Sequence, residues 1–201
     1  MQDLTLDNDT YKQLKRAFMG GFTHANANYT GKVLNDVTSI DFTSSYPSVM
    51  LSEKFPMSRF KPVKVKTIKE LEKILSRHAV IFDVQFINIK PRITQETYLS
   101  ESKCRNVINP VINNGRIFSA DSITTTLTEI DYSIMKQCYT WENIAVSNVK
   151  YAIKNYLPKP IIFSVLDLYQ KKTELKVHIE DKAQVFKLLF VIHYFHNPTP
   201  L

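Results

Sequence analysis

The stretch that decides the expected fold is Ile40-Asp41-Phe42-Thr43-Ser44-Ser45-Tyr46-Pro47-Ser48. The short β-branched run at residues 37–40 predicts a buried strand, which puts Asp41 at the strand end. Pro47 suits the first turn of a helix, so residues 43–45 form the turn between the two elements. Hydroxyl and backbone N–H groups then gather near a helix N-terminus, an arrangement that favours an anion such as a phosphate.

Two interpretations of Asp41 are open at this point. A strand-end Asp followed by Thr and Ser is most often a helix cap and turn, and the bare pattern favours that interpretation. The alternative is a divalent cation, because a carboxylate beside an anion is unfavourable unless a cation bridges the two. Mg²⁺ held by a carboxylate and by substrate phosphates provides such a bridge.

Size and composition indicate a folded protein with a polyanionic partner. The chain has 201 residues, of which 44% are hydrophobic, enough for a substantial core. Its net charge of +7 favours nucleic acid. Without a long apolar run or a signal-peptide layout, a cytoplasmic protein with no membrane partner is expected. Cys104 and Cys138 lack C-x-x-C spacing, so neither a zinc site nor a disulfide framework is indicated.

Alternating helix and strand patterns predict a mixed α/β fold. The expected helices are at residues 11–18, 68–77, 129–138 and 161–176. The expected strands are at residues 59–66, 79–89, 117–118, 124–127 and 144–152. The mixed, polar residues 91–110 predict a solvated loop, and a hairpin or loop is expected at residues 30–32.

Two helix starts carry capping signals. Thr67 with Glu70 predicts a capping box, and Thr128 predicts an N-cap. In the helix at 129–138, the apolar residues expected to face inward are Ile130, Ile134 and Met135.

Residues 41–48 resemble motif A of family B DNA polymerases, the D-x-x-S-L-Y-P-S signature, with Ser45 in place of the usual Leu. Upstream, residues 18–23 resemble the Y-x-G-G/A motif of protein-primed members, with Phe18 in place of Tyr. The two motifs stand in the family's order. The chain therefore resembles the N-terminal part of the polymerase domain of a protein-primed family B polymerase of the phage or plasmid type.

The resemblance implies template-directed DNA synthesis by two divalent ions, Mg²⁺ or Mn²⁺, about 3.5–4 Å apart. Asp41 would be the catalytic, metal-binding carboxylate, and the carbonyl of Phe42 a neighbour of the metal or triphosphate. Ser44 and Ser45 would meet the triphosphate. Tyr46 would pack under the sugar and exclude ribonucleotides by shape. These roles are implied by motif A alone.

DNA contacts are implied at two further places. Gly20, Gly21 and Phe22 would contact the template strand. Lys171 and Lys172 lie in a segment that resembles the basic element at the start of the fingers, although lysines at a helix C-terminus also stabilise the helix dipole.

Motif B, K-x-x-x-N-S-x-Y-G, is matched only in spacing. Lys187 and Tyr194 keep their places, and Lys187 would neutralise the leaving pyrophosphate. The Asn, Ser and Gly of the motif are replaced by Val191, Ile192 and Phe195. Motif C, which carries the second metal-binding Asp, is absent from the sequence, so the isolated chain is expected to be inactive.

The resemblance predicts an α/β (α+β) palm fragment with an antiparallel sheet and flanking helices. Residues 1–36 would lead into the palm, 37–157 would form the palm with an insertion that contacts a terminal protein, and 158–201 would start the fingers. The implied partners are template and primer DNA, deoxynucleoside triphosphates and a terminal protein. The implied compartment is the host cytoplasm for a phage protein or an organelle for a plasmid protein.

Two other classes of function remain open. One is a non-catalytic nucleic-acid-binding module derived from a polymerase, favoured by the divergent motif B and by the absence of motif C. The other is a structural domain in which Asp41 only caps a helix.

Overall fold

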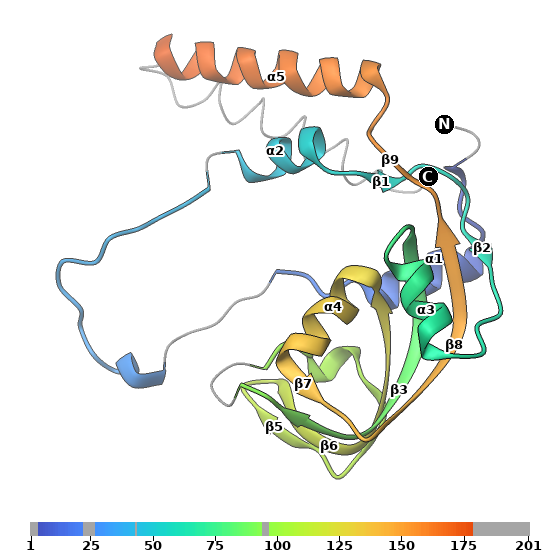
Figure 1. The fold of residues 1–201 in the computed structure, drawn as a ribbon. Coiled ribbons are helices and arrows are strands. Elements are labelled where there is room, and N and C mark those ends of the chain that lie inside the picture. Colours follow the sequence, from blue (N-terminus) through green and yellow to red (C-terminus); the bar gives the residue numbers. More distant parts are fainter. Residues whose placement is uncertain (1–3, 22–26, 43, 94–96, 179–201) are drawn as a thin grey trace. The chain divides into compact units, whose positions relative to one another are not determined.

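The computed structural model describes residues 4–21, 27–42, 44–93 and 97–178 (Figure 1). The chain forms two compact units. The first contains residues 1–38 and 55–155, and the second contains residues 39–54 and 156–201. The domain boundaries expected after residues 36 and 157 stay a prediction.

An antiparallel sheet is the framework of the first unit (Figure 1). Its central path runs β2-β8-β3-β6-β4, with β5 paired to β6 and β7 paired to β3. The bounds are β2 Lys61–Pro62, β3 Ala79–Pro91, β4 Arg105–Ile108, β5 Val111–Asn113, β6 Arg116–Thr128, β7 Tyr139–Thr140 and β8 Asn143–Ala152. A separate two-stranded pair joins β1, Phe55–Pro56, to β9, Lys154–Asn155.

Two long strands carry the core of this unit. β3 and β6 have 13 residues each and pair antiparallel, from Ile81 opposite Thr128 to Ile89 opposite Ala120. The buried side chains on one face of the pair include Val80, Phe82, Val84, Phe86, Ile123 and Leu127. Burying each such side chain contributes about 1.5–3 kcal/mol, so a mostly apolar, β-branched sequence at the centre of the sheet is what this packing requires.

Helices cover both faces of the central strands. On the Phe82 face lie α3, Ile68–Leu75, which buries Leu71, and α4, Glu129–Cys138, which buries Tyr132 and Met135. The rings of Phe82 and Tyr132 meet edge to face, with centroids 5.7 Å apart. On the other face lies α1, Asn8–Ala17, which buries Thr10, Gln13 and Ala17. The mixed α/β class with antiparallel sheets is therefore confirmed.

The second unit contains two described helices, α2, Ser45–Ser52, and α5, Lys159–His178, which pack against each other. The predicted helix at residues 161–176 is confirmed by α5. Among the described helices, none is both long and apolar enough to cross a bilayer.

Helix capping was predicted correctly at one site and only half correctly at the other. At α4, Thr128 Oγ1 accepts from the Asp131 N–H, and the Asp131 carboxylate accepts from the Thr128 N–H, 2.9 Å away. At α3, Thr67 Oγ1 accepts from the Glu70 N–H, but the Glu70 carboxylate accepts from the N–H of Lys66 at 2.9 Å. The reciprocal bond therefore reaches one residue further back than a capping box requires.

The phase of α4 also differs from the prediction. Ile130 is 63% exposed, so its expected inward position is wrong. Tyr132 and Met135 lie three residues apart on the buried face, and Ile134 is half-buried. A large aromatic side chain contributes more burial than Ile130, and this sets the rotation of the helix.

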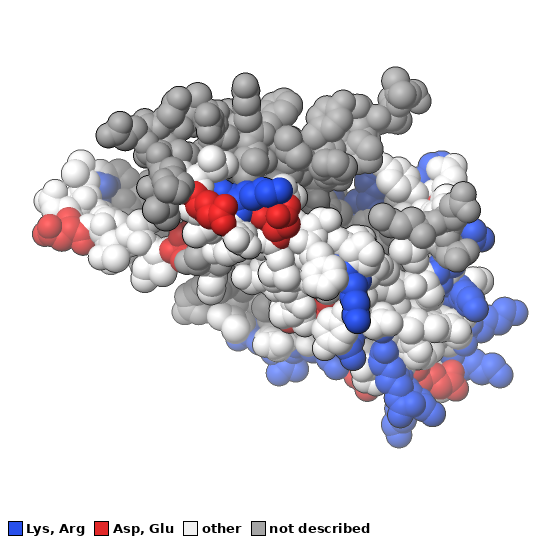
Figure 2. Space-filling model, turned by 90° about the horizontal axis from the view of Figure 1, so that it is seen from above, with Lys and Arg blue, Asp and Glu red and all other residues white. Residues whose placement is uncertain are grey.

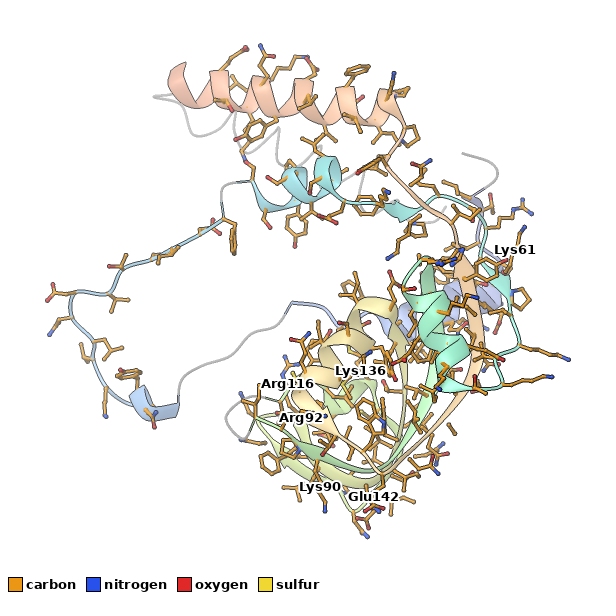
Figure 3. The ribbon with its side chains drawn as sticks, in the orientation of Figure 1. Lys61, Lys90, Arg92, Arg116, Lys136 and Glu142 are labelled. Carbon is orange, nitrogen blue, oxygen red and sulfur yellow. The ribbon has the colours of Figure 1, made fainter. Side chains whose placement is uncertain are left out.

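The solvated loop predicted at residues 91–110 is wrong. β4 lies within it and pairs with β6, and Leu99 is wholly buried. The Tyr139 hydroxyl accepts from the Leu99 N–H at 3.1 Å and donates to the Ile117 carbonyl at 2.7 Å. Arg116, which is labelled in Figure 3, donates to the carbonyl of Tyr98 at 2.6 Å. Distant residues therefore order a segment whose own sequence looks like a loop.

The strand predicted at residues 37–40 is also wrong, and with it the position of Asp41 at a strand end. These residues have no regular secondary structure, and the side chains of Val37 and Ile40 are 70% and 91% exposed. A strand needs a second strand to pair its N–H and C=O groups. Within the described residues, no segment pairs with residues 37–40.

We expect Tyr139→Phe to lower the free energy of unfolding by about 1–3 kcal/mol, because it leaves the buried Leu99 N–H and Ile117 carbonyl without their hydroxyl partner. Urea titration followed by circular dichroism measures the change. The matched control, Tyr11→Phe, alters a hydroxyl on a ring that is 54% exposed and should shift stability by less than about 0.5 kcal/mol. Equal effects in the two variants would contradict this role of the hydroxyl.

Candidate functional site

The described residues of the motif A stretch, 41–42 and 44–48, belong to the second unit and are exposed or half-buried. Asp41 and Phe42 have no regular secondary structure and are exposed, with Phe42 82% exposed. The N-cap of α2 is Ser44, in the left-handed conformation with φ of 52°, and its side chain makes no capping hydrogen bond. Tyr46, in the first turn of α2, is 81% exposed. Because the cap is Ser44, the interpretation of Asp41 as a helix cap is wrong.

Asp41 is a single carboxylate, so it could fill only part of the coordination shell of a metal ion. Within the described residues, no group of three or more His, Cys, Asp or Glu side chains could hold a metal ion. An exposed carboxylate still suits Mg²⁺, which keeps several waters and binds through one or two carboxylates and substrate phosphates. The exposed carboxylate of Asp41 offers oxygen atoms of this kind, three residues before the left-handed Ser44.

Two aspartates of the first unit have contrasting surroundings. Asp83 is buried, 6% exposed, and lies within the first unit among arginine, threonine and asparagine side chains. Asp121 is exposed and accepts from the Asn109 side chain at 2.7 Å. Asp83 is committed to a structural network, and its contacts leave it no role as a metal ligand.

The residues predicted to contact DNA or nucleotide differ in their local environments. Gly20 has φ of +73°, which favours glycine, whereas Gly21 has neither a positive φ nor a close neighbour. Lys171 donates to Asp167 at 2.8 Å, one turn earlier on α5, and this hydrogen bond raises the pKa of the lysine. Lys172 is half-buried. Phe22, Lys187 and Tyr194 lie outside the described residues.

The first unit contains a groove that the sequence patterns did not predict. It lies between α1 and the β4 region, by which we mean residues 102–105 at the start of β4, and it has an excess of positive charge. We call it the basic groove. It has a volume of about 460 Å³. Its lining residues are Lys12, Lys15, Arg16, Ser102, Lys103 and Arg105. On the face drawn in Figure 2, Lys and Arg side chains also gather on one part of the described surface.

Asp83, in the middle of β3, fixes the two arginines of the basic groove. Its carboxylate lies 3.6 Å from Arg16 Nη2 and 3.3 Å from Arg105 Nη2. The side chains of Thr126 and Asn148 also donate to it. The signal in the sequence was Asp83 itself, since a charged residue inside an apolar strand requires a partner.

The pKa of Asp83 reflects these contacts. Burial alone raises it, because the charged form loses water. The hydrogen bonds from Asn148 and Thr126 and the charges of Arg16 and Arg105 outweigh burial, so the pKa lies below its ordinary value of 3.8. Asp83 is therefore ionised throughout the neutral range, and the network is an ion-pair network.

Comparison with known proteins identifies a family and a relative that resemble this chain. Residues 2–189 match the family described as DNA polymerase type B, organellar and viral. The DNA polymerase of Bacillus phage B103 is 25% identical over 184 residues, which cover 89% of this chain and 29% of that protein.

Two solved structures of Phi29 DNA polymerase have a similar fold. The complex with primer-template DNA and incoming nucleotide substrates matches with a TM-score of 0.66 and 16% identity, over 92% of this chain and 30% of that one. The orthorhombic crystal form matches with a TM-score of 0.59 and 19% identity, over 98% and 32%. The chain therefore spans about a third of the length of the relatives that it matches.

We expect Asp83→Asn to lower the free energy of unfolding by about 2–3 kcal/mol at pH 7. Breaking a buried ion pair costs about 3–5 kcal/mol, and the partial exposure of both arginines, 36% and 44%, reduces that cost. Because the pKa of Asp83 is lowered in the folded state, its contribution is complete above the unfolded pKa of about 3.8. It is lost as the pH falls through the folded pKa.

Urea titrations between about pH 3 and 7 measure this difference. The gap between the native chain and Asp83→Asn should be constant from pH 7 down to about pH 5 and should narrow below about pH 4. Asp121→Asn, at an exposed position of β6, is the control and should change stability by less than about 0.5 kcal/mol at pH 7. A gap that widens at acid pH would contradict the ion-pair assignment.

Proposed function

Because the chain belongs to the organellar and viral type B DNA polymerases, we propose that it contributes to the nucleotidyl-transfer site of a protein-primed DNA polymerase. The reaction joins a primer 3′-hydroxyl to the α-phosphate of a deoxynucleotide, with release of pyrophosphate. Two divalent ions, Mg²⁺ or Mn²⁺, would stabilise the attacking and leaving oxygens in this reaction.

The observation that carries the proposal is the exposed motif A stretch. The Asp41 carboxylate is accessible, it does not cap α2, and it stands three residues before the N-cap Ser44. A carboxylate needed only for capping would lie at that N-cap. The arrangement supports a ligand role for Asp41.

Each residue of the stretch has a chemical task in this proposal. The Asp41 carboxylate and the Phe42 carbonyl would hold the metal. Ser44 and Ser45 would donate hydrogen bonds to the triphosphate, through hydroxyl and backbone N–H groups. The exposed ring of Tyr46 would pack against the sugar, where a 2′-hydroxyl would collide with it.

The partners follow from the same assignment. A solved Phi29 DNA polymerase structure holds primer-template DNA and incoming nucleotides. For this chain we propose template and primer DNA, deoxynucleoside triphosphates and a terminal protein, and action in a host cytoplasm or an organelle. Gly20, Gly21 and Phe22 would contact the template, and Lys171, Lys172, Lys187 and Tyr194 would contact DNA or nucleotide.

A non-catalytic nucleic-acid-binding module is the second candidate. It is favoured by one observation, that the described residues contain no group of three potential metal ligands. The two candidates differ in whether a metal ion promotes nucleotide binding at Asp41.

We expect the 201-residue chain to bind a deoxynucleoside triphosphate more tightly with Mn²⁺ than without it. Asp41→Asn should remove this gain, a loss of about tenfold in affinity or about 1.4 kcal/mol. Asp36→Asn is the matched control, because Asp36 is also exposed, precedes the motif by five residues and has φ of 57°, which asparagine tolerates. Titration calorimetry with and without Mn²⁺ measures both variants.

Equal affinities of the native chain and Asp41→Asn in Mn²⁺ would refute the motif A assignment. The same chain should show no primer extension, since Mg²⁺ with a single protein carboxylate is held weakly. Robust extension would show that a further carboxylate completes the site.

We expect Tyr46→Val to reduce the preference for deoxynucleotides over ribonucleotides by about tenfold, because it removes the ring that a 2′-hydroxyl would meet. Paired titrations with dGTP and GTP in Mn²⁺ measure the ratio. Since the ring is 81% exposed, the substitution should leave the melting temperature unchanged. Tyr29→Val, on a ring that is 51% exposed, is the control and should keep the native ratio. An unchanged ratio in Tyr46→Val would remove Tyr46 from the sugar pocket.

A further inference from the structure

We propose that the basic groove between α1 and the β4 region binds the phosphate backbone of a nucleic-acid strand. Its lining residues all belong to the first unit, and the motifs assign none of them a role. The inference rests on the proposed function only in taking DNA as the strand.

Charge is the first argument. Lys12, Lys15, Arg16, Lys103 and Arg105 bring five cations to the groove, and no carboxylate is among its lining residues. In the part of the chain that the structure describes, the side chains of Lys12, Lys15 and Lys103 form no ion pair. The carboxylate of Asp83 offsets one charge from behind, so four remain in excess. Gathering like charges is unfavourable unless an anion neutralises them.

Preorganisation is the second argument. Asp83 and Thr126 hold both Arg16 and Arg105 in place, with Arg105 Nη2 3.3 Å from each partner. A guanidinium group has five N–H donors, so these contacts occupy only part of it. Holding the side chain in advance lowers the entropy cost of binding, and the planar fork suits phosphate oxygens.

The helix dipole of α1 explains part of this cluster of cations. Lys15 and Arg16 lie in the last turn of α1, where cations stabilise the helix dipole. Lys103 and Arg105 belong to another part of the chain, and the dipole of α1 does not account for them. The convergence of two segments about 90 residues apart is what a binding site requires.

The chemistry of the lining favours the backbone of a strand over a free nucleotide. The lining residues include no aromatic side chain on which a base could stack. They offer cations and the hydroxyl of Ser102, which recognise phosphate oxygens without regard to base.

The place of the groove in the chain also favours a strand. α1 leads from the groove directly to Gly20, which stands four residues after Arg16 and has φ of +73°. Four residues span at most about 14 Å, so the groove and the glycine pair expected at the template lie along one short path.

The test is the affinity of the 201-residue chain for a fluorescent single-stranded oligonucleotide of about 20 nucleotides, measured by anisotropy from about 50 to 200 mM salt. Lys12→Ala/Lys15→Ala/Lys103→Ala removes three charges from the groove. The control, Lys64→Ala/Lys66→Ala/Lys69→Ala, removes three charges from exposed lysines elsewhere in the same unit. Lys12→Arg/Lys15→Arg/Lys103→Arg keeps the charge.

We expect the groove variant to lose affinity and its salt slope to fall by about 2, since each lost phosphate contact on a single strand contributes about 0.7. The control should keep the native slope, and the arginine variant should keep the native affinity. Far-ultraviolet circular dichroism and a thermal melt establish that all three variants are folded. The titration contains neither metal nor nucleotide, so a negative result speaks against the groove and not against the proposed transfer site.

Three outcomes would overturn the proposal. Equal losses in the groove variant and the control would mean that binding follows total charge. Displacement of the oligonucleotide by inorganic triphosphate at equal phosphate concentration would identify a site for a free polyphosphate. Preferential displacement by an acidic peptide of equal charge would identify a protein partner.

Discussion

The buried carboxylate of Asp83 is the interaction on which the first unit depends. It lies at the centre of β3, and it contacts side chains from α1, β4, β6 and β8: Arg16, Arg105, Thr126 and Asn148. Gln13 of α1 adds a bond to the carbonyl of Asn148 at 2.8 Å. A charge at this depth is unfavourable unless it is fully paired, so the register of four elements against β3 is constrained together. Hydrophobic burial on the Phe82 face supplies the driving force for folding. The contact of Asp83 with Arg16 fixes the position of α1 on the other face.

Local signals in the sequence were enough for the elements that carry their own pattern. The apolar run of β3, the helix of α3 and the N-cap Thr128 of α4 depend on residues that are close to one another in sequence. The segment at residues 97–108 does not. It is ordered by Tyr139 and Arg116, which lie further along the chain, and its own polar sequence gives no periodicity. Hydrophobic periodicity predicts which side chains of one helix or strand are buried. It does not predict hydrogen bonds to residues that are distant in sequence.

The same distinction separates the two candidate sites. The motif A stretch is continuous, so its residue types can be recognised from the sequence alone. The basic groove joins α1 to the β4 region, and no window of the sequence contains both. Its one signal in the sequence is Asp83, a charged residue inside an apolar strand. Such a residue predicts a cationic partner but does not identify which cation it is. The contacts of Asp83 with two arginines assign this carboxylate to the groove and not to a metal site.

The exposed state of residues 37–42 bears on how a transfer site is held. Ile40 and Phe42 are 91% and 82% exposed, and burying such side chains is worth about 1.5–3 kcal/mol each. A β-branched stretch is stable as a strand only when another strand pairs with it and an apolar layer covers it. The 201 residues span about a third of the length of the relatives that they match. A transfer site needs its carboxylate fixed to within a fraction of an ångström, and motif A residues alone do not provide that rigidity. In the proposed function the chemical groups of this stretch are close together in sequence, whereas their precise placement would require a strand pairing that the described residues do not contain.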